Sequence, residues 1–292
     1  MGNNKEIRIR KILFRIMIYV LAVFIFIYTI APVVWLFISS ISTKAELFTI
    51  PLRWIPKEPT FERYAEVFLG SSTTMSGPTH QFIPAFLNSL QVAALVTIIS
   101  LVVGIMAVYA FSRLRFRGKY PARMSILSVQ MIPAVVLVIP LHILISRVGM
   151  MDNKMTLVVV YLSFVLPFVV LIMRGYFDSI PYELEEAARI DGCNRLGAFF
   201  RVMLPLSSSG LTATTIFVFI LSWNEFFYAM NFTTTIASKT VPIVLTEFAS
   251  KNAIEFNLMS AASIITLLPP VLLALVFQKY IISGLSSGAV KG

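Results

Sequence analysis

The stretch ELEEAARIDGCNRLGAFFRVMLP, from Glu183 to Pro205, separates two long apolar runs. It gathers seven charged side chains in a chain of which only 13% of the residues are charged and 58% are hydrophobic. Soluble domains contain far more charge than this. The sequence therefore predicts an all-α membrane protein in which the charged stretch is a loop at one surface of the bilayer.

Six mostly apolar runs are long enough to cross a hydrocarbon core about 30 Å thick. They cover roughly 12–40, 84–111, 122–146, 155–177, 207–230 and 258–283. The first run is too long for a secretory signal and is interpreted as a span. We expect a tail over 1–11 followed by one transmembrane domain over 12–292. Prolines inside these runs predict kinks, either for packing or as hinges of a pathway.

The basic residues predict the orientation. If both termini are cytoplasmic, the inside segments hold sixteen of the 24 Lys and Arg residues. Loop 112–123, SRLRFRGKYPAR, has five basic residues and no acidic one, which is typical of a cytoplasmic loop. Because apolar spans divide the positive charge, the net charge of +10 does not indicate a nucleic-acid partner.

The charged loop, about 178–205, has the signals of two short helices joined by a turn. Ser179 is a candidate N-cap before Pro181. Gly192 ends the first helix in a backbone conformation with positive φ, and Asn194 caps the second. Such a pair is either a solvated connector or a surface that docks into a groove of another protein.

Part of the loop resembles the EAA signature of ABC importer permeases: Glu-Ala-Ala, three residues, Gly, nine residues, an aliphatic residue, any residue, Leu-Pro. The matching residues here are Glu186, Ala187, Ala188, Gly192, Val202, Leu204 and Pro205, with Val in place of the usual Ile. The resemblance implies that the loop docks on an ATP-hydrolysing subunit. The residues it assigns to this coupling are Glu186, Ala187, Ala188, Asp191, Gly192, Leu204 and Pro205.

The similarity extends along the chain and is greatest to carbohydrate-type, MalG-like permeases. The supporting stretches are WIPKEPTFERY, FLNSL, YAFSRLRFRGK, MIPAVVLVIPL, SWNEFFYA and the ending GLSSGAVKG. This likeness implies a six-span, MetI-like permease of a bacterial inner membrane. It further implies a MalF-like partner permease, two ATP-binding cassette subunits that carry ATP and Mg, and an extracytoplasmic solute-binding protein.

The chain lacks the motifs of an enzyme. It has no G-x-x-x-x-G-K-[ST] sequence, so we expect ATP to be bound by a partner. His80 and His142 are far apart in the sequence, and no catalytic group, metal or cofactor is expected on this chain.

Glu225 is the one acidic residue well inside an apolar run. With Asn224 and Trp223 it offers the amide and aromatic groups that sugars bind, so these three residues are the candidate solute pathway. A polar lock between helices is the alternative for Asn224 and Glu225. If both lie on one helix, they point about 100° apart. We then expect Asn224 to face solute and Glu225 to hold the span in place.

Other functions remain open from the residues alone. The solute is a carbohydrate or a compound such as glycerol phosphate. A self-sufficient channel or uniporter, or a membrane enzyme using Glu225 and His142, also fits six spans. The EAA loop disfavours the last two, because neither needs a docking surface.

Overall fold

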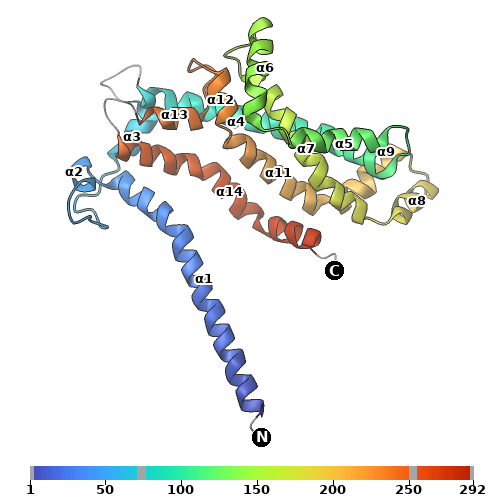
Figure 1. Ribbon diagram of the computed structural model, residues 1–292, viewed down its shortest axis with the longest axis horizontal. Coiled ribbons are helices and arrows are strands. Elements are labelled where there is room, and N and C mark those ends of the chain that lie inside the picture. The colour runs from blue at the N-terminus through green and yellow to red at the C-terminus, as the bar shows by residue number, and fades with distance from the viewer. Residues whose placement is uncertain (1–2, 71–76, 250–254, 290–292) are drawn as a thin grey trace. The chain divides into compact units, whose positions relative to one another are not determined.

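The computed structural model describes residues 3–70, 77–249 and 255–289. Their long regular elements are helices, as predicted (Figure 1). The helices are α1 (Asn3–Ile41), α2 (Lys44–Leu47), α3 (Glu62–Leu69), α4 (Pro78–Arg113), α5 (Lys119–Gln130), α6 (Ala134–Arg147), α7 (Lys154–Ser179), α8 (Tyr182–Ile190), α9 (Arg195–Ala198), a π-helical turn (Phe199–Met203), α10 (Leu204–Leu206), α11 (Ser208–Trp223), α12 (Phe227–Phe232), α13 (Val241–Glu247) and α14 (Phe256–Ala289).

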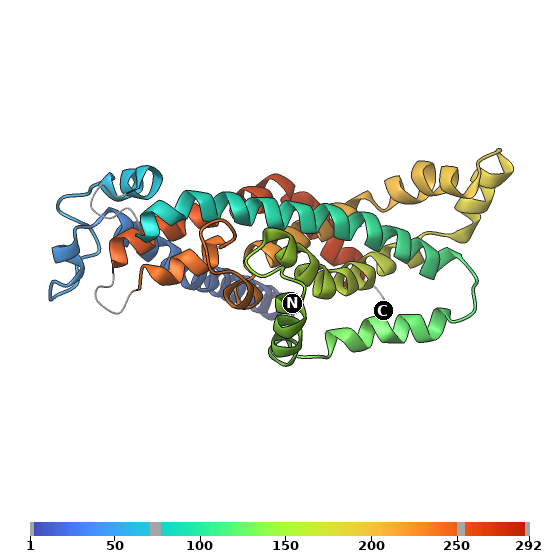
Figure 2. The same cartoon turned by 90° about the horizontal axis from the view of Figure 1, so that it is seen from above.

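Four of these helices are long and apolar enough to cross a membrane alone, within α1, α4, α7 and α14. Two bent pairs raise the number to six if each pair is one span. The predicted third span is broken between Gln130 and Ala134, and α5 meets α6 at 98° (Figure 2). Pro133 at this break has no N–H to continue a helical ladder.

The predicted fifth span is also interrupted. The segment 195–206 meets α11 at 76°, and α11 ends at Trp223 before α12 begins at Phe227. Asn224 is the C-cap of α11, and Glu225 lies in the break. The premise that both side chains project from one continuous helix is therefore wrong. A straight helix and two helices with a break between them can have the same apolar composition. The break in the fifth span could therefore not be predicted from the sequence.

The contacts of the chain fall into two compact units. The first contains residues 1–75 and 248–265, and the second contains 76–247 and 266–292. In the first unit, α1 exposes its apolar side chains from Ile12 to Tyr28, as a helix surrounded by lipid can. Its end is tied down by Asn257, whose amide donates to the carbonyls of Ser39 and Ser42, and by a hydrogen bond of 2.7 Å between Ser40 and Tyr64.

In the second unit, α4 packs most extensively on α7, and α11 covers both. Glycines let these helices approach closely. A Cβ added at Gly104 would lie 2.6 Å from Val169 Cγ1, and one at Gly210 would lie 2.4 Å from Tyr176 Cγ. The main buried cluster of this unit includes side chains from α4, α6, α7, α12 and the π-helical turn.

Polar groups hold the segment 233–241 onto this core. The Asn88 amide on α4 donates to the carbonyls of Ile236 and Lys239, both at 3.0 Å. Ser89 Oγ accepts from the Val241 N–H at 2.8 Å. Asp152, two residues before α7, accepts hydrogen bonds from the backbone N–H groups of Thr234 and Thr235. Buried polar groups thus specify the position of a segment that has little regular structure.

Candidate functional site

The charged loop forms two short helices, α8 and α9, with local signals close to those expected from its sequence (Figure 2). Gly192 has φ of 93°, and Asn194 Oδ1 accepts from the Gly197 N–H at 2.7 Å to cap α9, which confirms both predictions. Ser179 is not the cap of α8. It is the last residue of α7, its hydroxyl donates to the Tyr176 carbonyl, and Pro181 takes the N-cap position.

Most of the EAA residues lie on the surface of the second unit. Glu186, Ala187, Asp191, Gly192 and Pro205 are exposed, and Ala188 and Leu204 are half-buried. Five large hydrophobic side chains are exposed on the same loop, and sequence reasoning did not select them: Tyr182, Leu184, Ile190, Leu196 and Phe200. Apolar groups mixed with charges on a short two-helix surface are suited to contact with another protein.

Glu185 differs from its neighbours because it is buried. Its Oε1 accepts from the Tyr109 hydroxyl at 2.7 Å, and its Oε2 lies 3.4 Å from Arg113 Nε. Both partners belong to α4. The loop is thus attached to α4 by charge and hydrogen bonding beneath an exposed outer face.

A second feature is a cavity of about 480 Å³ where both helix breaks meet, here called the broken-helix cavity. In lipid, irregular backbone is tolerated only where protein buries it or where it lines a watery cavity. The lining residues are Val129, Gln130, Ile132, Ala134, Leu137, Ser163, Phe164, Phe168, Leu221, Glu225 and Tyr228. Among the candidate pathway residues, Glu225 is the one in this lining.

The broken-helix cavity combines aromatic faces with polar groups. The rings of Phe164 and Tyr228 stack with centroids 5.8 Å apart. Gln130 contributes an exposed amide, and Ser163 a hydroxyl. Amides and hydroxyls match sugar hydroxyls, while ring faces cover sugar C–H surfaces. Gln130 and the aromatic pair escaped the sequence analysis because nothing in an apolar run shows which side chains meet.

Glu225 holds the start of α12. Its Oε1 accepts from the Tyr228 N–H at 2.8 Å and its Oε2 from the Ala229 N–H at 3.1 Å. These N–H groups have no carbonyl within the short helix to accept from them, so the carboxylate satisfies them. The sequence suggested that Glu225 holds its span in place. The contacts of its carboxylate are made to the following helix, α12.

Asn224 and Trp223 lie apart from the cavity lining. Asn224 is exposed at the break. Trp223 is only 1% exposed and packs on Phe86 and Phe219, with ring centroids 5.2 and 5.8 Å away. The structure therefore places Trp223 in the packing between α4 and α11, which differs from the expected solute contact.

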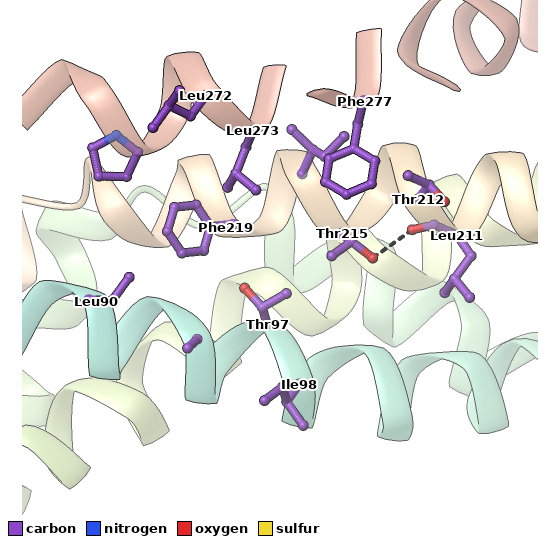
Figure 3. Close-up of a pocket in the computed structure, with 13 residues that line it drawn as sticks. Leu90, Thr97, Ile98, Leu211, Thr212, Thr215, Phe219, Leu272, Leu273 and Phe277 are labelled. Carbon is purple, nitrogen blue, oxygen red and sulfur yellow. Dashed lines mark hydrogen bonds between the residues drawn. The ribbon is translucent and has the colours of Figure 1, made fainter. Parts of the chain in front are cut away.

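A larger cavity, of about 670 Å³, lies between α4, α11 and α14 (Figure 3). Its three threonine hydroxyls donate to carbonyls of their own helices: Thr97 to Ala93, Thr212 to Ser208 and Thr215 to Leu211. Its wall is otherwise apolar. This cavity suits apolar groups rather than a sugar, so the smaller broken-helix cavity is the better candidate for a polar solute.

The described residues contain no group of three or more His, Cys, Asp or Glu side chains placed to hold a metal ion. The ring of His142 stacks on Phe232 at 6.1 Å, which is a packing contact.

Comparisons with known proteins agree with this architecture. A family model described as the inner membrane component of binding-protein-dependent transport systems matches residues 100–287. The chain is 35% identical to the trehalose/maltose transport system permease protein MalG of Thermococcus litoralis, over 97% of this chain and 99% of that protein. It is 32% identical to the sulfoquinovosyl glycerol transport system permease protein SmoH of Agrobacterium fabrum, over 89% and 88% of the two chains.

A solved structure shares the fold. It belongs to a bacterial ABC transporter that imports the acidic polysaccharide alginate, with a TM-score of 0.78 and 24% identity over 92% of this chain and 96% of that one. The matched family consists of multi-pass membrane components of transport systems rather than enzymes. Family model, relatives and fold agree: the chain belongs to the family of inner membrane components of binding-protein-dependent transport systems, as a permease subunit.

Proposed function

We propose that this chain forms half of the translocation pathway of an ATP-driven importer for a carbohydrate. A homologous permease supplies the other half, two ATP-binding cassette subunits hold ATP and Mg, and an extracytoplasmic binding protein delivers the solute. Both termini and the EAA loop lie on the cytoplasmic side. The observation that carries the proposal is the exposed face of the EAA loop, a docking surface in a chain that has no nucleotide-binding motif of its own.

Two observations support a carbohydrate as the transported solute. The relatives named above are permeases for trehalose/maltose and for sulfoquinovosyl glycerol. The broken-helix cavity offers an amide, a hydroxyl and a pair of stacked rings, which is the chemistry of sugar recognition.

The mechanism follows from the two breaks and the loop. ATP binding closes the cassette subunits, which move the docked α8. The permease pair then switches between inward-open and outward-open states, and hydrolysis resets them. The bend between α5 and α6 and the break between α11 and α12 line the cavity and allow this change, because a break absorbs backbone rotation at few residues.

The function is tested by measuring ATP hydrolysis and solute uptake in proteoliposomes. These contain this chain, its partner permease and the ATP-binding cassette subunits, and the binding protein is added. With binding protein present, we expect one sugar in a panel to stimulate ATP hydrolysis and to accumulate inside, whereas glycerol phosphate does neither. Stimulation by glycerol phosphate alone would show a non-sugar importer. Solute flux that needs neither ATP nor the cassette subunits would show a channel or uniporter.

The solute contacts are tested separately. We propose that Gln130 and Asn224 meet the solute and that Glu225 holds α12. Gln130→Ala and Asn224→Ala should lower uptake in a fully assembled complex, since Gln130 lines the broken-helix cavity and Asn224, next to Glu225 of that lining, has an exposed amide at the same break. Glu225→Ala should instead destabilise the complex, because it leaves two N–H groups of α12 without acceptors. Ser128→Ala, on an exposed face of α5, is the matched control and should change neither.

A further inference from the structure

A buried charged cluster lies between α8 and α4, and it is separate from the exposed EAA residues. It consists of Glu185, Tyr109 and Arg113 and is called the anchor below. The side chains of Glu185 and Arg113 are 7% and 6% exposed. Nothing in the EAA signature selects them. Burying a charge is costly, so a buried carboxylate on a loop with an exposed docking face needs a structural explanation.

Arg113 joins three elements at once. It lies in the last turn of α4, and its Nη2 donates to the carbonyls of Phe177 at 3.1 Å and Ile180 at 2.6 Å, at the end of α7. A cation is favourable there, because the last carbonyls of a helix are unpaired and carry partial negative charge. With Nε beside Glu185, the same guanidinium therefore connects the ends of α4 and α7 to α8.

Apolar side chains enclose the anchor. Phe199 packs edge-on against Tyr109 with centroids 5.0 Å apart, and Phe177 and Met203 belong to the same buried cluster. Shielded from water, the ion pair is screened little, and losing one partner leaves an uncompensated charge. Removing either partner of the anchor therefore costs much more than removing one side of an exposed ion pair would.

The contact is also incomplete. Among the described residues, Arg113 Nε and Glu185 Oε2 have no hydrogen-bond partner, although they lie 3.4 Å apart. Charge-assisted N–H···O bonds are usually about 2.7–2.9 Å long. At this distance the pair is held by charge, and the hydrogen bonds of the anchor are the one from Tyr109 to Glu185 and those from Arg113 to the carbonyls of Phe177 and Ile180.

The covalent chain gives α8 no comparable support. On one side, Ile180 and Pro181 connect it to α7. On the other, the chain passes through a turn, α9, a π-helical turn and a 76° bend before α11. The anchor residues of α4 also contact both connections: Arg113 Nη2 donates to the Ile180 carbonyl, and the Tyr109 ring packs against Phe199.

We propose that Glu185, Tyr109 and Arg113 are positioning residues that make α8 and the cytoplasmic end of α4 move as one body. Movement imposed on α8 by a docked ATPase then reaches a transmembrane helix directly. The inference rests on the proposed function for the source of that movement, but the rigidity of the joint does not depend on it.

The first arm of the test measures coupling in the complex reconstituted in nanodiscs. Glu185→Ala and Arg113→Ala should retain the ATPase subunits, because the exposed docking face is unchanged. Coupling free energies usually correspond to 5–150-fold effects, so we expect solute stimulation of ATP hydrolysis to fall about tenfold or more. The double variant should be no worse than either single variant. Tyr109→Phe should be milder, since it removes one hydrogen bond and no charge.

The matched control is Asp178→Ala. Asp178 pairs with Arg174 at 3.0 Å and accepts from Ser112 at 2.7 Å, so it also links α7 to α4 at this end, but its side chain is 40% exposed. Exposed pairs contribute little, so coupling should stay normal. Normal coupling in the Glu185 and Arg113 variants would overturn the proposal, as would loss of the ATPase subunits from either complex.

The second arm measures the joint itself and does not require a working transporter. Spin labels at the exposed residues Glu183 on α8 and Arg117 beyond α4 report their separation. We expect one narrow distance distribution in all nucleotide states, and a broad one when Glu185→Gln removes the charge but keeps the size. A distribution that Glu185→Gln leaves unchanged would overturn the anchor. A wild-type complex without solute stimulation would instead contradict the proposed function.

Discussion

Gly192 shows how a single backbone angle positions the docking helix. Its φ is 93°, and a Cβ added there would meet no atom within 4 Å, so the requirement for glycine is conformational and not steric. An L-residue in this region costs about 1–2 kcal/mol, and a β-branched one more. We expect Gly192→Val to reorient α8 against α9 and to abolish transport by weakening attachment of the ATPase subunits.

Copurification of the ATPase subunits on a tagged permease measures this effect. Gly192→Asn is the matched variant, because asparagine adopts the left-handed conformation more readily and should retain most of the attachment. If Gly192→Val transports normally with its ATPase subunits fully bound, the loop does not have the coupling role proposed for it.

Asp152 fixes the segment that follows α12. It accepts hydrogen bonds from the backbone N–H groups of Thr234 and Thr235 at 2.8 and 3.0 Å and from the hydroxyls of Thr235 and Ser238. Burial opposes ionisation of this carboxyl group, but the hydrogen bond from Ser238 and those from Thr234 and Thr235 outweigh burial and hold its pKa well below the ordinary value.

The sign of this shift gives a pH dependence. Because the folded-state pKa is depressed, the stabilisation is fully present above the unfolded pKa of about 3.9 and is lost as the pH falls through the folded pKa. We expect Asp152→Asn to lower the free energy of unfolding by about 1 kcal/mol at neutral pH.

Thermal unfolding in detergent at several pH values measures the difference in stability between the wild type and Asp152→Asn. It should be constant from about pH 6 to 8 and should shrink below about pH 4. Glu62→Gln, at an exposed carboxylate, is the control and should show no such trend. A difference that peaks in acid would contradict the assignment.

At the scale of helices, packing depends on close approach at two glycines. At Gly210 in α11, an added Cβ would lie 2.4 to 2.6 Å from three atoms of the Tyr176 ring. Overpacking of this kind costs about 1–3 kcal/mol. We therefore expect Gly210→Ala to separate α11 from α7 and to lower the thermal stability of the purified chain.

Gly175, one residue from Tyr176 on α7, supplies the control. No atom lies within 4 Å of a Cβ added there, so Gly175→Ala should be neutral or stabilising, since alanine loses less backbone entropy in a helix. The Gly210→Ala variant should regain stability when combined with Tyr176→Ala. If Gly210→Ala and Gly175→Ala lower the stability equally, the loss comes from helix propensity and not from the close packing of α11 on α7.

At the scale of the whole molecule, the charge distribution predicts the orientation in the membrane. We expect segment 41–83 outside and loop 112–123 inside, because the cytoplasmic side retains the excess of Lys and Arg. Single cysteines at the exposed residues Glu58 and Arg117, in a Cys193→Ser background, test this.

An impermeant thiol reagent applied to intact cells should label position 58 and leave position 117 unlabelled until the membrane is permeabilised. Labelling of position 117 from outside would invert the topology and with it the proposed site of ATPase docking. The tip of the outer segment, 71–76, lies outside the described residues.

The sequence by itself determined the membrane class, the helical architecture and two of the three helix-end signals predicted in the charged loop. These features depend on composition or on residues a few positions apart: apolar run length, Gly192 after a helix and Asn194 before the next. The spacing of the EAA signature is equally local, and it indicated the transport family that the comparisons then showed.

The tertiary structure alone decided which side chains meet. The anchor joins Tyr109 to Glu185 across 76 positions of the chain, the broken-helix cavity forms where two separate helix breaks converge, and Trp223 is buried against Phe86. In a membrane helix every face is apolar, so periodicity does not reveal which face packs on protein and which meets lipid. That choice is made by contacts between helices distant in sequence, and it turned Glu185 into a buried anchor while leaving the adjacent Glu186 on the surface.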